Sequence, residues 1–364
     1  MTADSYDIVH FRPEHLNDVL AVLAGLWPYG PDLCAHYFKW RHVENPYAKA
    51  VRGVVALHRG KPVGFRGYMA GGFRGDDGSD VDVLYPCDTV VAPEHRNQGL
   101  SVRMGKLASE FRQSGFRYFI NLTSGNSSRP GYVSLGFEPL GKRVLWQRHG
   151  RNPFLWALQV WSKRRDRAAS PDARHRIRFG RFSDIHVAED PRAGEMAAII
   201  AADRPDGPAL RIRQDEAFYA WRYRNPVRQY AFYYWMDGDV ARAFAVLDVS
   251  SDGLTGSILD YGEAKDGALR RILAHVCECG DFATVTALSY GIDARLARIL
   301  DELSFTPVHT TKTIFRRGTV HSLAPSVLFR PVASAINEDD FRVGELDLRS
   351  PKHWRLKPIC SDGA

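Results

Sequence analysis

The sequence predicts an α/β chain that folds as two similar domains in tandem, and three observations support this prediction. First, the chain has 364 residues, which exceeds a typical single domain and suits two. Second, the β-branched run at 89–91 is followed by a polar loop and by an amphipathic run from residue 100, which is typical of a strand, a loop and a helix. Third, several short motifs of the first half recur in the second half in the same order.

The recurring motifs define the elements of each copy. A short strand opens the copy, an aromatic segment ending in Asn-Pro follows, and a strand–turn–strand pattern comes next. The turns are Arg59-Gly60 and Asp237-Gly238, which are typical of hairpins. The matching segments are 9–11 and 177–179, 37–46 and 218–226, 54–65 and 231–246, and 135–139 and 303–307. We therefore expect a first domain at 1–150 and a second domain at 176–318.

Two segments lie outside this repeat. Residues 151–175 form an amphipathic and basic linker, in which Phe154, Leu158 and Trp161 share one helical face ahead of a basic cluster. Such a helix suits either peripheral contact with a membrane surface through 153–165 or burial between the domains, and both interpretations stay open. Residues 319–364 form a C-terminal tail with apolar positions but no clear period.

Composition narrows the class of function. The net charge of +7 favours anionic partners such as CoA, sugar nucleotides or acidic glycans. No basic stripe interleaved with aromatic residues is present, which argues against nucleic acid as a partner. The sequence has neither a membrane-spanning apolar run nor the pattern of a signal peptide, so we expect a cytoplasmic protein. The five scattered cysteines argue against a disulfide framework, and we expect no metal site.

The loop between the predicted strand at 89–91 and the predicted helix from residue 100 suits a phosphate group. Consecutive backbone amides lead into a helix N-terminus, where the helix dipole favours an anion. Gly99 lacks a Cβ at the point where a phosphate must approach the main chain. The segment from Arg96 to Ser101 is therefore built like a pyrophosphate cradle.

Two motifs around this loop resemble the GNAT acetyltransferase superfamily. Residues 91–101 follow the pattern V-x-P-x-x-R-x-x-G-L-S, which is similar to the acyl-CoA loop of that superfamily, although the last position there is usually Gly or Ala. About thirty residues beyond the loop, Asn126, Tyr132 and the Gly136-Phe137 pair match a second GNAT pattern. This version of the motif looks most like GNAT proteins of bacterial cell-surface polysaccharide biosynthesis.

The resemblance implies a fold and a reaction. Each domain would be a mixed central sheet flanked by helices. The protein would be an N-acyltransferase that uses an acyl-CoA as co-substrate, with acetyl-CoA as the favoured donor. The acceptor would be the primary amine of a small molecule or an amino sugar, attacking the thioester directly. By the same resemblance, residues of the strand and loop would hold the cofactor. These are Thr89, Val90, Val91, Arg96, Asn97, Gln98, Gly99, Leu100, Ser101 and Asn126.

Two residues of the first copy match catalytic positions. Tyr132 lies where the family commonly has a general acid, and its phenol could protonate the departing thiolate. Asp88 opens the strand before the loop and could accept the proton of the amine. Each residue also has a structural alternative, namely a tyrosine packed on the core and an aspartate that caps a bulge or pairs with an arginine.

The second copy lacks this chemistry. It has no V-x-P-x-x-R-x-x-G pattern, and Leu300 stands where the first copy has Tyr132. The Trp-Arg pair at residues 40–41 and its repeat at 221–222 occur in both copies and are expected to be framework. We therefore expect a single CoA site, in the first domain, and a second domain that supports or completes the acceptor pocket.

Two other functions are compatible with the sequence. Aminoacyl or peptidyl transferases of the cell wall also duplicate this fold, but their CoA loops are degenerate, whereas the loop here is intact. A CoA-binding module without catalysis, in a polysaccharide-assembly complex, is the other alternative. No residue pattern identifies the acceptor, the acyl chain length or the oligomeric state.

Overall fold

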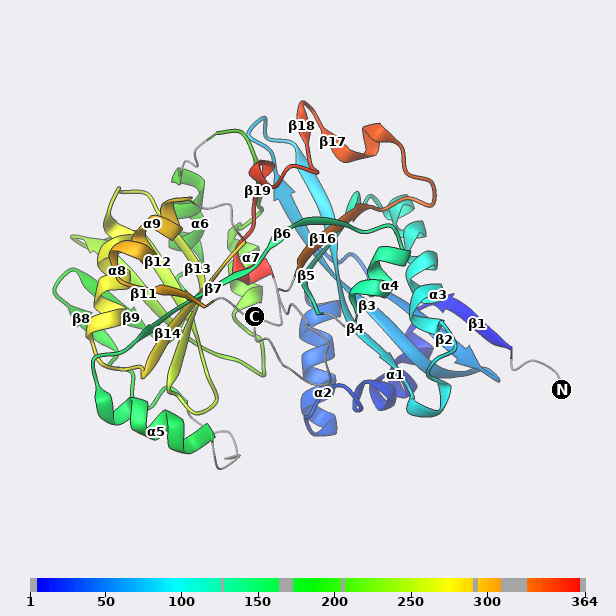
Figure 1. Cartoon of the computed structure of the whole chain (residues 1–364), viewed down its shortest axis with the longest axis horizontal. Helices are drawn as coiled ribbons and strands as arrows, with labels where there is room; N and C mark the ends of the chain where they lie inside the picture. Colours follow the sequence, from blue (N-terminus) through cyan, green and yellow to red (C-terminus); the bar gives the residue numbers. More distant parts are fainter. Residues whose placement is uncertain are drawn as a thin grey trace, which may run out of the picture.

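The computed structural model describes residues 5–125, 128–163, 173–203, 207–290, 294–308 and 326–360. Figure 1 shows two β-sheets side by side, each with its own helices. Each sheet is mixed: among the residues described, the first sheet contains two parallel pairs of neighbouring strands and the second contains one, and the other pairs are antiparallel. This confirms the predicted fold class of two α/β domains with mixed central sheets.

The first sheet is built mostly from the N-terminal half of the chain. Its order is β1 (Tyr6–His10), β2 (Arg52–His58), β3 (Lys61–Arg74), β4 (Asp80–Val91), β5 (Tyr118–Ser124), β16 (Ser326–Pro331) and β6 (Glu138–Lys142). Strand β3 is buried along almost its whole length, so other elements cover both of its faces. The far end of β3 also pairs with β10 (Leu210–Ile212), which in turn pairs with β19 (Trp354–Arg355).

The second sheet repeats this plan. Its order is β15 (Thr306–Val308), β7 (Val144–His149), β14 (Thr284–Ser289), β13 (Thr255–Glu263), β12 (Val240–Val249), β11 (Gln229–Asp237), β9 (Ile185–Ala188) and β8 (Gly180–Phe182). The small hairpin of β17 (Arg342–Val343) and β18 (Leu346–Asp347) lies apart from both sheets.

Helices pack against the two sheets. In the first repeat α1 packs on β3 and β4, while α3 packs on β1 to β4. In the second repeat α6 packs on β12 and β13, and α8 packs on β11 to β13. The helices are α1 (Leu16–Leu23), α2 (Pro31–Phe38), α3 (Leu100–Leu107), α4 (Arg129–Ser134), α5 (Pro153–Lys163), α6 (Ala193–Ala202), α7 (Glu216–Arg222), α8 (Ala268–Glu278) and α9 (Ala294–Glu302). Among the residues described, no helix is both long and apolar enough to cross a bilayer.

The two sheets exchange strands, which differs from the domain boundaries expected from the sequence. Strand β7 falls inside the expected first domain at 1–150, yet it lies between β14 and β15 in the second sheet. Strand β16 falls inside the expected tail at 319–364, yet it lies between β5 and β6 in the first sheet. The apolar run Val327-Leu328-Phe329 is fully buried there, which explains why this segment is apolar without being a separate unit.

The repeats meet at a symmetric contact between the two Trp-Arg segments. Trp40 Nε1 donates a hydrogen bond to the backbone oxygen of Trp221 at 3.0 Å, and Trp221 Nε1 donates to the oxygen of Trp40 at 2.7 Å. The two indole rings stack with their centroids 5.3 Å apart. Because each repeat makes the same contact to the other, the pair is related by local two-fold symmetry, as in an isologous interface. The Trp-Arg segments are therefore part of the framework.

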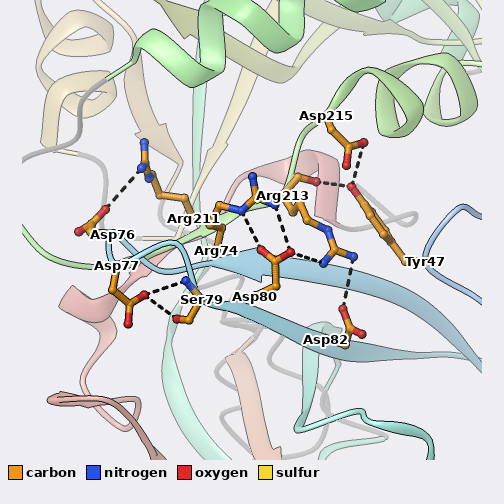
Figure 2. Close-up of polar contacts among 10 residues, drawn as sticks. All are labelled: Tyr47, Arg74, Asp76, Asp77, Ser79, Asp80, Asp82, Arg211, Arg213 and Asp215. Carbon is orange, nitrogen blue, oxygen red and sulfur yellow. Dashed lines mark hydrogen bonds and ion pairs between the residues drawn. The ribbon is translucent and has the colours of Figure 1, made fainter.

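A group of charged residues also fixes the second repeat against the β3–β4 hairpin (Figure 2). Arg213 reaches Asp80 at 3.2 Å and Asp82 at 3.3 Å, and its guanidinium lies 4.3 Å from the centre of the Tyr47 ring. Tyr47 in turn donates its hydroxyl proton to the backbone oxygen of Arg213 at 2.5 Å. Arg74 binds Asp80 through two hydrogen bonds, at 2.7 and 3.1 Å. This network holds the second repeat against the β3–β4 hairpin of the first repeat.

Candidate active site

The main feature of the first repeat is the separation of β4 from β5. These parallel strands pair with each other at only two positions, Val83 with Tyr118 and Leu84 with Phe119. Beyond that point β4 stays paired with β3 as far as Val91 and diverges from β5. The edge of β4 over residues 85–91 therefore offers backbone N–H and C=O groups that β5 does not use. Such an edge suits an extended ligand that can complete the hydrogen bonding.

A β-bulge interrupts β4 in this region. The register with β3 shifts so that Phe65 lies opposite Val90 and Gly67 lies opposite Cys87. Asp88, inside the bulge, has φ of 48°, a left-handed conformation that few residues other than glycine adopt. Bulges commonly re-aim a side chain beside an active site. Here the bulge places the Asp88 side chain in a buried position beside the separated strands.

Three donors bind the carboxylate of Asp88. Oδ1 accepts hydrogen bonds from Arg41 Nη1 at 2.5 Å and from Trp27 Nε1 at 3.2 Å, and Oδ2 lies 3.0 Å from His42 Nε2. Burial by itself raises the pKa of Asp88, but Arg41 and His42 outweigh burial and hold that pKa below its ordinary value. These contacts weaken the expectation that Asp88 is the general base, because the carboxylate would accept a proton only at the expense of its ion pair.

The loop expected to bind phosphate ends at the N-terminus of α3. Asn97 and Gly99 both have left-handed backbones, with φ of 63° and 68°. The amides of Val102 and Arg103 donate to the oxygen of Gly99 at 3.1 and 3.0 Å, so helical hydrogen bonding starts there. The amides that precede them lie at the end of the helix where no intrahelical acceptor exists. Together with the helix dipole, they suit an anionic group.

The side chains of this loop divide into exposed and anchoring ones. Arg96, Asn97 and Gln98 are exposed, and Arg96 Nε donates to the backbone oxygen of Val91 at 3.1 Å. Leu100 is buried and anchors the start of α3 in the core. The loop backbone is therefore held at both ends, while its outer surface is open to a ligand.

Tyr132, in the second half of α4, lies between the separated strands. The groups that influence its pKa come from both sides, with Cys87 and Thr89 on β4 and Asn121 on β5. Burial is the largest influence and raises the pKa of Tyr132 above that of an ordinary tyrosine, while Arg66 acts in the opposite direction. The phenol is therefore protonated throughout the neutral range. Tyr132 therefore offers a phenolic proton in the gap between β4 and β5.

Arg66 connects the Tyr132 ring to the N-terminus of α3. Its guanidinium lies 4.9 Å from the centre of the Tyr132 ring and donates from Nη1 to the backbone oxygen of Ser101 at 3.2 Å and to Ser101 Oγ at 3.3 Å. The side chain is only 3 % exposed. The small residue at position 101 is thus a contact for this arginine, which explains why serine fits where the family usually has Gly or Ala.

A cavity of about 320 Å³ opens beside the separated strands. Its wall combines residues 85–88 of β4 with Ile120, Leu122 and Thr123 of β5, and the second repeat closes it with Val227 and Arg228. Its aromatic side chains are Trp27, Tyr29, Tyr37 and Tyr85, and its charged ones are Arg41, Asp88 and Arg228. The cavity is large enough for a small organic ligand and adjoins the edge of β4 that β5 leaves unpaired.

One group of side chains beside this cavity has the residue types that can bind a metal ion. The ligand atoms of His42, Cys87 and Asp88 lie within 4.8 Å of one another. Arg41, however, already holds the Asp88 carboxylate at 2.5 Å and would place a second positive charge next to the ion. We therefore assign the group to the buried ion-pair network and not to a metal.

The structure brings together most of the residues expected from the sequence. Thr89, Val90 and Val91 lie on the free edge of β4, the segment 96–101 forms the loop and first turn of α3, and Tyr132 lies across from them. Asn126 lies outside the described residues. Sequence reasoning missed Trp27, Arg41, His42 and Arg66. The repeated Trp-Arg pair predicted a structural role for Arg41 and not a place in the site. Arg66 belongs to no motif that the sequence analysis identified.

Comparisons with known proteins identify the fold. No family model matches the sequence, and no curated protein matches it either. Among solved structures, a probable N-acyltransferase from Enterococcus faecalis V583 matches with a TM-score of 0.58 at 10 % identity, covering 90 % of this chain and 73 % of that one. A GCN5-related N-acetyltransferase from Kribbella flavida matches with a TM-score of 0.55 at 17 % identity, covering 90 % and 71 %.

A third match has the tandem organisation. A tandem GNAT protein from the clavulanic acid biosynthesis pathway matches with a TM-score of 0.50 at 10 % identity, covering 90 % of this chain and 99 % of that one. At these identities the likeness concerns the fold. The chain has the GNAT fold in two tandem copies, as the motifs predicted.

Proposed function

We propose that the protein is an acyl-CoA-dependent N-acyltransferase, with acetyl-CoA as the favoured donor and the primary amine of a small molecule or amino sugar as the acceptor. The observation that carries this proposal is the separation of β4 from β5, with the Tyr132 side chain between them and the α3 N-terminus at one end. The GNAT fold supports it as well.

The donor would bind along the free edge of β4. Thr89, Val90 and Val91 would hold the pantetheine and the thioester through their backbone groups, and the segment 96–101 would hold the pyrophosphate. Backbone donors that are fixed in advance stabilise a developing oxyanion without reorganisation, and this is commonly a large term in catalysis. Asn126 would contact the cofactor arm.

The chemistry needs two proton movements. The amine must be uncharged when it attacks the thioester carbon, and the C–S bond then breaks to leave a thiolate. Tyr132 would give its proton to this thiolate, because burial keeps the phenol protonated at neutral pH. The proton lost by the amine would return to the phenolate through water, which restores the starting state.

Asp88 has a supporting role in this proposal. Its carboxylate fixes Arg41 and His42 and places negative charge in the wall of the acceptor cavity, which attracts an ammonium group. Direct proton transfer to Asp88, as first expected, is the competing assignment.

The test is thiol release from acetyl-CoA in the presence of a panel of amines and amino sugars. We expect at least one amine to raise the rate above slow hydrolysis, and mass spectrometry of the product should show one added acetyl group on nitrogen. Binding of CoA with no turnover for any acceptor or acyl chain would instead favour the CoA-binding module. Failure to bind CoA would remove the basis of the proposal.

A further inference from the structure

Helix α5 packs on the second sheet, and the side chain of Gln159 points from the helix toward that sheet. Gln159, near the middle of the helix, is 5 % exposed. Its Nε2 donates a hydrogen bond to Thr255 Oγ1 at 2.8 Å, and its Oε1 accepts one from Thr284 Oγ1 at 2.9 Å. These two threonines lie at the start of the neighbouring strands β13 and β14. A glutamine therefore fixes the orientation of the helix on the sheet.

The outward side of the same helix is apolar. We call it the α5 face, and it consists of Pro153, Phe154, Trp156, Ala157, Val160 and Trp161, all of which are exposed. Phe154 is 82 % exposed and Trp156 is 49 % exposed. The sequence 153–161 contains no charged residue. This is the reverse of the usual arrangement, in which a surface helix turns its apolar side to the core.

The size of the α5 face argues against a second protein chain as its main partner. A helix of 11 residues is about 16 Å long and about 10 Å wide, which gives an apolar area on the order of 160 Å². A stable protein interface buries roughly 800 Å² on each partner. A bilayer has no such requirement, because a few aromatic side chains can enter it one by one.

Charge and residue type favour an anionic lipid surface. Tryptophan prefers the boundary between water and hydrocarbon. The sequence after the helix continues as Lys163, Arg164, Arg165, Asp166 and Arg167, with four cations and one anion. Basic residues beside an apolar helical face are typical of helices that lie on anionic membranes.

We propose that the α5 face docks the protein on the surface of a bilayer that contains anionic lipid. Phe154 and Trp156 would enter the headgroup region of that bilayer. The rest of the second repeat would remain in water.

The test is co-sedimentation of the full chain with vesicles of phosphatidylcholine containing about one third phosphatidylglycerol. We expect the wild type to bind these vesicles and to bind pure phosphatidylcholine vesicles much more weakly. Phe154→Ser combined with Trp156→Ser should lower the partition coefficient at least about tenfold, because two large apolar side chains are lost from the buried area. Val240→Ser is the matched control, since Val240 is an exposed apolar residue on another surface, at 50 % exposure.

Two further measurements keep the test decisive. Circular dichroism and the thermal midpoint should show that the double variant is folded, since its side chains point outward. Wild-type binding to neither vesicle, or equal binding of the double variant, would overturn the proposal. A wild-type dimer in light scattering that the double variant abolishes would also overturn it, because the α5 face would then bind a second copy.

Discussion

Helices α3 and α8 begin with the same backbone geometry, but among the residues described only the N-terminus of α8 receives a carboxylate from its own repeat. Gly99 and Gly267 precede them, with φ of 68° and 81°, and each glycine oxygen accepts a hydrogen bond from the amide four residues further on. The connection before α3 runs from residue 92 to 99, whereas the connection before α8 runs only from 264 to 267. In the second repeat, Glu263 Oε2 accepts a hydrogen bond from the amide of Leu269 at 3.0 Å. The second repeat thus places its own carboxylate at the helix end where, in the first repeat, we propose that a phosphate binds.

The helices that close the two repeats show the same kind of difference. The amide of Phe137 donates to the oxygen of Tyr132 at 3.1 Å, and the amide of Phe305 donates to the oxygen of Leu300 at 2.9 Å. These matching bonds show that Leu300 is the structural counterpart of Tyr132. The two repeats therefore share the backbone of the fold. They differ in a few side chains and in the length of one loop, and these are the features on which the proposed acyl transfer depends.

The largest effect is expected from a buried aspartate in the first repeat. Asp88→Asn removes the charge that partners Arg41, and leaving a buried ion without its partner costs roughly 3–5 kcal/mol of unfolding free energy. The folded pKa of Asp88 is lowered, so its contribution is complete above the ordinary pKa of about 4 and disappears as the pH falls through the folded pKa. Denaturant unfolding should therefore show a constant loss from about pH 5 to 8 that shrinks below about pH 4.

The same variant separates the two roles of Asp88. Arg41→Met is the matched control, because it disrupts the same ion pair and leaves the carboxylate in place. Under the supporting role, both variants lose turnover to a similar extent, measured per folded molecule. A loss confined to Asp88→Asn, together with disappearance of the acidic limb of the pH–rate profile, would restore Asp88 as the general base.

Tyr132→Phe is expected to have the next largest effect. The variant keeps the ring and its contact with Arg66 but removes the proton, so kcat should fall by at least about a hundredfold with little change in CoA affinity. Tyr68→Phe is the control, since Tyr68 is a buried tyrosine beside the same arginine. A Tyr132→Phe enzyme within a few-fold of wild-type turnover, with a lower thermal midpoint, would assign Tyr132 to packing alone.

The two helix-capping glycines provide a paired test of the cofactor site. Gly99→Glu should place a side chain and a negative charge beside the phosphate position, and the rise in thermal midpoint caused by CoA should disappear. Gly267→Glu imposes the same backbone strain in the second repeat and should leave that rise intact. An equal loss of the CoA effect in both variants would contradict the assignment of the site to the first repeat.

The smallest change is expected in the number of CoA molecules bound per chain. This number is the most direct comparison of the two repeats. Calorimetry should find one CoA bound per chain, both for the wild type and for Glu263→Gln. The short connection at 264–267 should prevent binding even when the carboxylate is neutralised. A second CoA in the variant would show that Glu263 alone closes the site, and a second CoA in the wild type would refute the single-site interpretation.

Sequence reasoning succeeded where the determinants are local. The start of α3 at residue 100, the hairpin turn at Arg59-Gly60 and the loop before α3 follow from short-range residue preferences. It failed where contacts are distant. The partners of Asp88 come from residues 27, 41 and 42, and Arg66 reaches Ser101 only when β3 packs against α3. The sheet that β7 or β16 joins is likewise set by tertiary packing, because a strand pattern does not specify its neighbours.

The strand exchange has a consequence for how the protein reaches its native state. Strand β16 separates β5 from β6 in the first sheet, although it is synthesised almost two hundred residues after them. The domain that carries the proposed active site therefore cannot complete its sheet on the ribosome until residue 331 has emerged. Pairings so distant in sequence slow folding and leave strand edges open in the meantime. We therefore expect the two repeats to gain their structure as one late, cooperative unit, with β5 and β6 exposed to misassociation until translation is nearly finished.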